Sequence, residues 1–121
     1  MQLRYVSEGP LLAHRKTKRP LVSVVMSLHN DADTAVRAIE SVLNQSFEDL
    51  ELVIADCAST DRTPLICERF HDRDIRVEYI HLDTDNMAVG AHTALCAVRG
   101  SYVLMMRPCD WLGSDLLHEL M

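Results

Sequence analysis

The chain has 121 residues, of which 48% are hydrophobic and 25% are charged, as in an ordinary globular domain with a hydrophobic core. The net charge of −6 arises from residues 21–121, whose acidic balance disfavours nucleic acid as a partner because phosphate binding needs basic side chains. No apolar run approaches the roughly 18 residues of a membrane-spanning helix, and the N-terminus lacks the apolar core of a signal peptide, so a cytoplasmic location is predicted.

Residues 1–19 show no regular apolar period and end at Pro20, which predicts a basic tail or linker ahead of one domain over residues 20–121. Most of the basic side chains of this tail lie in the segment 14–19. Such a cluster could contact an anionic membrane surface. We favour a solvated leader, because the cluster is short.

From Pro20 onward, strand patterns alternate with helix patterns. Apolar runs predict four strands, at 21–26, 52–55, 77–82 and 102–106. Apolar side chains at helical spacing predict four helices, at 36–43, 65–70, 87–99 and 116–120. The predicted boundary residues are Asp33 or Thr34, Thr63 and Ser114 as N-caps, Pro64 at the first helical position and Gly100 as a C′ residue.

This alternation predicts an α/β fold with a parallel sheet, helices on both faces and right-handed crossovers. In such sheets, ligands bind beyond the carboxyl ends of the strands, where the strand order reverses. The segments that follow the first, second and fourth strands are therefore the candidate site: 27–31, 56–61 and 107–110.

Two of these segments carry side chains with chemistry of interest. Residues 56–61 contain Asp, Ser and Thr groups that can exchange hydrogen bonds with a base or a sugar, although a turn and helix cap would use the same residues. Asp110 could bind a divalent cation weakly. Arg107 could pair with phosphate oxygens or with a surface carboxylate. The glycine-rich motifs of dinucleotide-binding and P-loop proteins are absent from the sequence.

The cysteines form no CxxC pair and match no zinc-finger spacing, which predicts free thiols at Cys57, Cys67, Cys96 and Cys109. A soft-metal or redox site is an alternative, because thiolate and imidazole ligands suit zinc. Its ligands would be Cys57, Cys109, His29 and His92, whose spacing is not diagnostic.

Several segments in sequence order resemble family 2 glycosyltransferases of the GT-A fold. Residues 22–30 are similar to the family's opening strand and loop, and residues 38–47, Ala-Ile-Glu-Ser-Val-Leu-Asn-Gln-Ser-Phe, to its first helix and turn. Residues 56–61, Asp-Cys-Ala-Ser-Thr-Asp, resemble the family's Asp-Asp-Gly-Ser-Thr-Asp. Residues 99–103 lead into the strand that carries the family's Asp-x-Asp motif, and residues 110–112 resemble the segment just after that motif. The resemblance covers about residues 20–121.

The resemblance implies a strand order of 3-2-1-4 and a nucleotide-sugar donor such as a UDP-sugar. It also implies a divalent cation, Mn²⁺ or Mg²⁺, on the diphosphate and transfer of the sugar to an acceptor hydroxyl. Asp110 would be the metal ligand. The residues that would bind the nucleotide-sugar are Ser27, His29, Asn30, Asp56, Asp61 and Arg107.

The departures from the family pattern fall within this site. Cys57 and Ala58 replace the second acid and the glycine after it. Arg107 and Cys109 replace both acids of the Asp-x-Asp motif. The family's Ala-Arg-Asn segment falls on residues 90–92, which are Gly-Ala-His. We therefore expect donor binding that is weak and nearly independent of the metal.

No residue matches the family's catalytic base in the expected place, so the chain alone is expected to lack transferase activity. A non-catalytic binding or assembly module derived from the same fold is the alternative function. In the family an acceptor-binding half packs against this domain, and an apolar surface left in its place favours a homo-oligomer.

Overall fold

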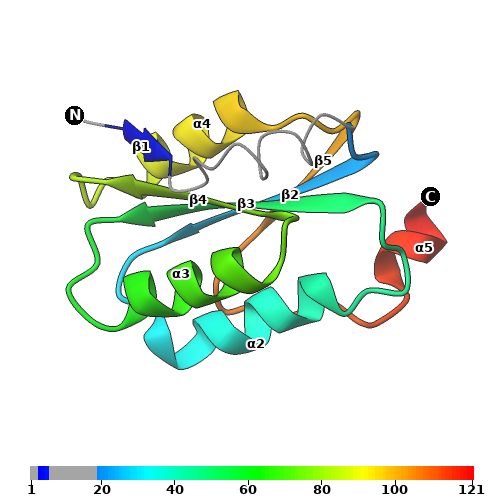
Figure 1. Ribbon diagram of the computed structural model, residues 1–121, viewed down its shortest axis with the longest axis horizontal. Coiled ribbons are helices and arrows are strands. Elements are labelled where there is room, and N and C mark those ends of the chain that lie inside the picture. The colour runs from blue at the N-terminus through cyan, green and yellow to red at the C-terminus, as the bar shows by residue number, and fades with distance from the viewer. Residues whose placement is uncertain (1–2, 6–18) are drawn as a thin grey trace.

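The computed structural model describes residues 3–5 and 19–121, which form one five-stranded sheet with flanking helices (Figure 1). The strands are β1 (Leu3–Tyr5), β2 (Val22–Leu28), β3 (Leu50–Cys57), β4 (Val77–Leu82) and β5 (Tyr102–Met106). The helices are α2 (Ala32–Leu43), α3 (Thr63–Arg73), α4 (Met87–Ala97) and α5 (Leu116–Leu120).

The order of the strands confirms the topology that the resemblance implied. The sheet runs β1-β4-β3-β2-β5, and its last four strands are mutually parallel. Counted from β2, these four have the order 3-2-1-4. Strand β1 adds an antiparallel edge to β4, which the sequence pattern did not indicate. Apart from β1 and Arg19, the tail or linker predicted for residues 1–19 lies outside the described residues.

Helices cover both faces of the sheet, with α2 and α3 on one side and α4 on the other (Figure 1). Two buried apolar clusters correspond to these two layers. Val24 of β2 packs in the same cluster as Ile39 of α2, and Val25 of β2 in the same cluster as Ala94 of α4. The central strands are thus buried on both faces, which explains their apolar runs. No helix in the described part of the chain has the length and apolarity to cross a membrane.

Strand β3 extends beyond the apolar run 52–55 that predicted it, and the extension at its start contains a charged residue. The side chain of Glu51 lies in this extension, and the residue is only 5% exposed. Its Oε2 accepts hydrogen bonds from the Ser23 hydroxyl and from the Arg99 backbone N–H, both at 2.6 Å. These donors satisfy the carboxylate inside the core, so the strand runs through it.

Gly100 does not end α4 as the sequence predicted. The helix ends at Ala97, and Gly100 does not have a positive φ. A Cβ at position 100 would instead lie 2.8 Å from the Ser23 nitrogen and 3.0 Å from the Val22 carbonyl carbon. The glycine is needed because the chain entering β5 passes close to the backbone of β2.

The N-cap positions of α2, α3 and α5 differ from the predicted ones by one to three residues. Asp31 precedes α2, Arg62 precedes α3 and Asp115 precedes α5, and none of the three makes a side-chain capping bond. Thr63 is therefore the first residue of α3 and not its N-cap. At α4, the Asn86 side chain caps the helix by accepting from two backbone N–H groups.

Candidate functional site

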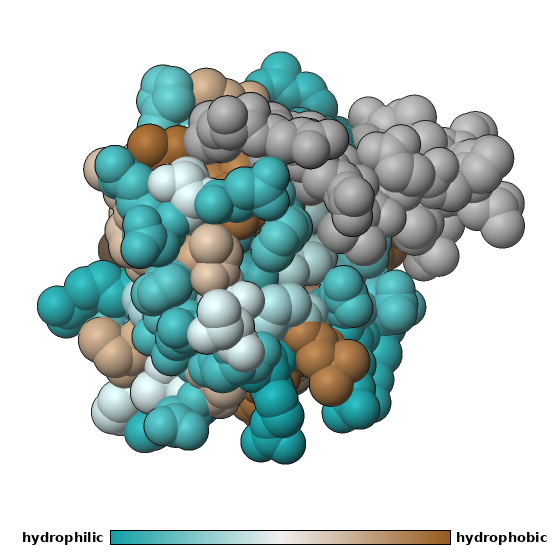
Figure 2. All heavy atoms as spheres, turned by 90° about the vertical axis from the view of Figure 1, so that its left-hand side faces the viewer, coloured by the Kyte–Doolittle hydropathy of each residue, from teal (hydrophilic) through white to brown (hydrophobic). Residues whose placement is uncertain are grey.

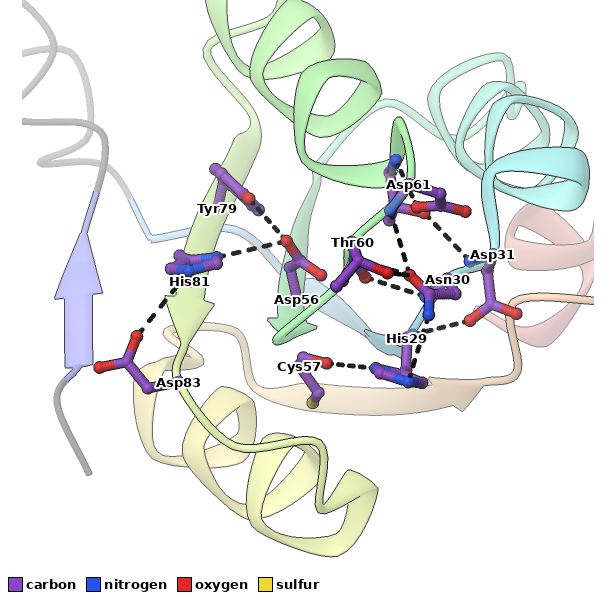
Figure 3. Close-up of polar contacts among 12 residues, drawn as sticks. His29, Asn30, Asp31, Asp56, Cys57, Thr60, Asp61, Tyr79, His81 and Asp83 are labelled. Carbon is purple, nitrogen blue, oxygen red and sulfur yellow. Dashed lines mark hydrogen bonds and ion pairs between the residues drawn. The ribbon is translucent and has the colours of Figure 1, made fainter.

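The predicted site segments meet at the carboxyl edge of the parallel strands, the face that Figure 2 shows as mainly hydrophilic. Asn30, after β2, points into the loop after β3 (Figure 3). Its Oδ1 accepts hydrogen bonds from the backbone N–H groups of Thr60 at 2.7 Å and Asp61 at 3.2 Å. Its own N–H donates to the Ser59 hydroxyl oxygen at 2.9 Å. One amide side chain therefore organises the opposite loop.

Reciprocal bonds run from the second loop back to the first. The Thr63 hydroxyl oxygen accepts from the Asp31 N–H at 3.0 Å, and Asp61 Oδ2 accepts from the Ala32 N–H at 3.2 Å. Asp61 Oδ1 accepts from the Thr63 N–H at 2.8 Å. Desolvation acts to raise the pKa of Asp61, but these hydrogen bonds outweigh it and hold the pKa below its usual value. Asp61 Oδ2 thus joins the two loops, while Oδ1 holds the turn into α3.

Each loop contains one residue with a left-handed backbone conformation. Asn30 has a φ of 53° and Ala58 a φ of 50°. Asparagine tolerates this region, whereas alanine does so at a cost of about 1–2 kcal/mol. The family pattern has glycine at the position of Ala58. The conformation that glycine would provide is therefore retained, with strain, by an alanine.

Asp56, the second-last residue of β3, is fully buried and is hydrogen-bonded through one of its two oxygens only. Its Oδ2 accepts from the Tyr79 hydroxyl at 2.9 Å and lies 3.3 Å from His81 Nδ1 (Figure 3). Its other oxygen, Oδ1, is buried and has no hydrogen-bond partner among the described residues. A buried carboxylate oxygen is costly to leave unpaired, and Oδ1 is the buried side-chain oxygen of the described residues that lacks a donor.

Sequence reasoning missed both partners of Asp56. Tyr79 and His81 lie on the same face of β4, and the register pairs Asp56 with His81. Burial, followed by the Asp56 charge, raises the pKa of Tyr79, so its hydroxyl remains a neutral donor. His81 Nε2 also lies 4.0 Å from Asp83 Oδ1. The side chains of β4 alternate between the two faces of the sheet, and the implied strand order places β4 beside β3. Together these two features could have identified Tyr79 and His81 as partners of Asp56.

The soft-metal alternative does not form in the described part of the chain. Burial, together with the charges of Asp56 and Asp85, raises the pKa of the Cys57 thiol to about 11, so it stays protonated at neutral pH. The His29 ring Nδ1 is hydrogen-bonded to the Cys57 backbone oxygen. His92 faces Cys96 on α4 at 3.7 Å, away from this grouping. Residues 3–5 and 19–121 contain no group of three or more His, Cys, Asp or Glu side chains placed to hold a metal.

Cys57 contacts α4 through its sulfur. A Cβ added at Gly90 would overlap the Cys57 Sγ atom and lie 3.4 Å from Ser27 Cβ. Gly90 therefore lets α4 approach the ends of β2 and β3 closely. With the Cys57 side chain in this orientation, position 90 has no room for a Cβ.

Arg107 and Asp110 form an ion pair after β5. Arg107 Nε donates to Asp110 Oδ2 and Nη2 donates to Oδ1, both at 3.2 Å. The hydrogen bond from the Arg107 side chain lowers the pKa of Asp110 below its usual value. Mg²⁺ and Mn²⁺ need free oxygen ligands, whereas both Asp110 oxygens face a guanidinium group. The residues at this position therefore do not fit a divalent cation.

A cavity of about 220 Å³ connects the end of β2 with the end of β5. Ser27 and Arg107 both line it, beside three methionines and a proline. The structure thus groups the predicted residues in three places along one edge of the sheet. Ser27 and Arg107 share the cavity, and His29, Asn30 and Asp61 belong to the cross-bonded loops. Asp56 lies near the end of β3 and faces side chains of β4.

The chain is similar to known proteins over most of its length. A sequence model described as glycosyl transferase family 2 matches residues 23–119. The chain is 36% identical over 104 residues to the succinoglycan biosynthesis protein ExoO of Rhizobium meliloti, covering 85% of this chain and 29% of that protein.

The solved structures that share the fold include two that hold a nucleotide-sugar. The mannosyltransferase PcManGT from Pyrobaculum calidifontis, in complex with GDP-Man and Mn²⁺, has a TM-score of 0.74 and 27% identity, covering 84% of this chain and 31% of that one. S. aureus TarS 1–349, in complex with UDP-GlcNAc, has a TM-score of 0.75 and 22% identity, covering 83% and 30%. The chain thus spans about a third of the length of each of these proteins.

Proposed function

Because the chain belongs to glycosyltransferase family 2, we propose that residues 20–121 bind the nucleotide-sugar donor of a glycosyl transfer to an acceptor hydroxyl. The transfer step is proposed for the longer proteins of which such a domain is a part, and we assign no catalytic residue to this chain. TarS and PcManGT were solved with UDP-GlcNAc and GDP-Man respectively. A UDP- or GDP-sugar is therefore the proposed ligand class.

The unpaired Asp56 oxygen is the observation that carries this proposal. Uracil and guanine both present a ring N–H on their hydrogen-bonding edge, whereas adenine and cytosine present a ring acceptor at that place. A carboxylate can only accept when ionised, so it favours the first pair of bases. We propose that Asp56 Oδ1 receives this N–H, while Tyr79 holds Oδ2. Asn30 and Asp61 shape the neighbouring loops, and Ser27 and His29 are the further residues proposed to contact the nucleotide-sugar.

Replacing the acceptor tests the proposal. We expect the unmodified chain to bind UDP or GDP more tightly than CDP and ADP, and Asp56→Asn to weaken binding of the preferred nucleotide by about tenfold. Isothermal titration calorimetry with the four diphosphates measures both effects. Asp83→Asn removes the same charge from an exposed side chain nearby and serves as the matched control. Equal binding of all four nucleotides, or none, would contradict the proposal.

An assembly role is the second candidate, and the open edge of β5 favours it. Among the described residues nothing pairs with the outer edge of this strand. Tyr102 is 58% exposed and Met105 52% exposed, and the strand carries no charge. Uncharged, exposed edge strands are templates for pairing with another chain. We propose that two copies associate through β5.

We expect light scattering to show dimers or larger species of the unmodified chain as its concentration rises. Val103→Lys combined with Met105→Lys should shift the chain to a monomer, because lysines on an edge strand oppose its pairing with another chain. Val36→Lys, at an exposed apolar position on α2, is the control and should leave association unchanged. A clean monomer of the unmodified chain at high concentration would rule the association out.

Two further partner and location predictions remain proposals. Contact of the basic segment 14–19 with an anionic membrane concerns residues outside the described part of the chain, apart from Arg19, whose Nε donates to the Arg99 carbonyl oxygen at 3.0 Å. The cytoplasmic location is likewise a proposal from composition.

A further inference from the structure

The end of β5 places a fixed positive charge beside the end of β2. Met106, the last residue of β5, is paired in register with Met26 of β2, and the residue that follows each of them in the sequence lines the same cavity. These next residues are Arg107 and Ser27. The Arg107 side chain is 78% exposed, so its guanidinium is accessible to a ligand in or above that cavity.

Asp110 holds this guanidinium in a two-pronged pair. Both of its oxygens face Arg107, and Oδ2 also accepts from the Arg107 backbone N–H at 3.3 Å. A divalent cation at Asp110 would have to displace a permanent positive charge and then remain beside it. The two charges repel each other, so this carboxylate is a poor anchor for Mg²⁺ or Mn²⁺.

We propose that this chain binds the donor's diphosphate without a metal ion. When the donor binds, the Arg107 guanidinium leaves Asp110 and binds the diphosphate instead. The inference rests on the proposed nucleotide-sugar function and assigns the residue that binds the diphosphate of the donor. A guanidinium matches two oxygens of a phosphate as well as it matches a carboxylate, so the same two donors can change partners. Asp110 is then a competitor for Arg107 and not a ligand of the donor.

The exchange predicts an effect of Asp110 with the opposite sign from that of a metal ligand. If Asp110 held a cation on the diphosphate, removing its charge would weaken nucleotide binding. If Asp110 competes for Arg107, the same change releases the guanidinium and removes a negative charge next to the phosphates. Asp110→Asn should therefore tighten UDP binding, by about threefold to tenfold.

The experiment is a calorimetric titration of the full chain with uridine, UDP and inorganic pyrophosphate, each in EDTA and in Mn²⁺. We expect UDP to bind with affinities that agree within about twofold between the two conditions. Arg107→Gln should weaken UDP and pyrophosphate by about tenfold and leave uridine unchanged. Arg69→Gln, which removes an exposed charge from α3, is the control and should change none of the three.

The outcomes separate this inference from the proposed function. Manganese-dependent tightening of UDP by tenfold or more on the unmodified chain, or weaker UDP binding by Asp110→Asn, would overturn the inference and leave the donor function standing. Arginine-dependent binding of pyrophosphate without any preference among bases would support the inference and contradict the proposed function. Absence of binding by both UDP and pyrophosphate would overturn the inference.

Discussion

Gly100→Ala is expected to lower the free energy of unfolding by about 2–3 kcal/mol, the cost of overpacking a site that cannot relax. The added methyl would lie 2.8 Å from the Ser23 nitrogen and 3.0 Å from the Val22 carbonyl carbon. These are backbone atoms of β2, which is held in register by β3 and β5 on its two sides. Relief would require the chain that enters β5 to move away from the sheet.

Urea denaturation followed by circular dichroism measures this loss. Gly113→Ala is the matched control, because a Cβ at that position meets no atom within 4 Å and its φ is not positive. The control should stay within about 1 kcal/mol of the unmodified chain and is expected to be neutral or slightly stabilising. Equal stability of the two variants would show that the close contact at Gly100 does not constrain the fold.

Glu51→Ala is expected to cost about 2–4 kcal/mol, because it removes the acceptor of two buried donors. The Ser23 hydroxyl and the Arg99 N–H both donate to one Glu51 oxygen, and the Ser23 oxygen in turn accepts from the Gly100 N–H at 2.8 Å. This network joins the starts of β2 and β3 to the turn before β5. Its loss should therefore destabilise the whole sheet.

The same denaturation experiment distinguishes the network from a general effect of charge. Glu51→Gln keeps an acceptor oxygen in place and should lose less than half as much stability as Glu51→Ala. Glu40→Ala removes a carboxylate of the same size from the exposed face of α2 and should change stability by less than about 0.5 kcal/mol. A Glu51→Ala variant as stable as the Glu40→Ala control would show that the buried carboxylate is dispensable.

The parallel core was predictable because it depends on local composition. The bounds of β4 and β5 agree with the predicted 77–82 and 102–106. An apolar run marked the strand even at β5, which lies at the edge of the sheet and is largely exposed. The strand order came from the resemblance and not from the runs. The pattern did not predict β1, a strand of three residues whose structure depends on pairing with β4.

The site was predictable in outline but not in its contacts. The sequence named Asp56 and Arg107 as candidates, yet their partners depend on strand register and on the turn after β5. The sequence left open whether Arg107 pairs with phosphate or with a carboxylate, and the structure shows the carboxylate of Asp110. The soft-metal alternative was wrong because His29 is engaged by the Cys57 backbone, while the thiol points toward α4. None of these pairings has a signature in spacing.

The cross-bonded loops after β2 and β3 bear on how a ligand would be received. Side chains of Asn30, Asp61 and Thr63 already bind backbone donors of the opposite loop. Ordering the backbone of one residue costs about 1–2 kcal/mol of conformational free energy. The loop residues are already ordered in the folded chain, so ligand binding does not have to supply this free energy. The heat-capacity change on binding should then reflect only the surface that the ligand itself buries, with no contribution from a loop folding around it. The association rate should likewise be governed by encounter and not by loop closure.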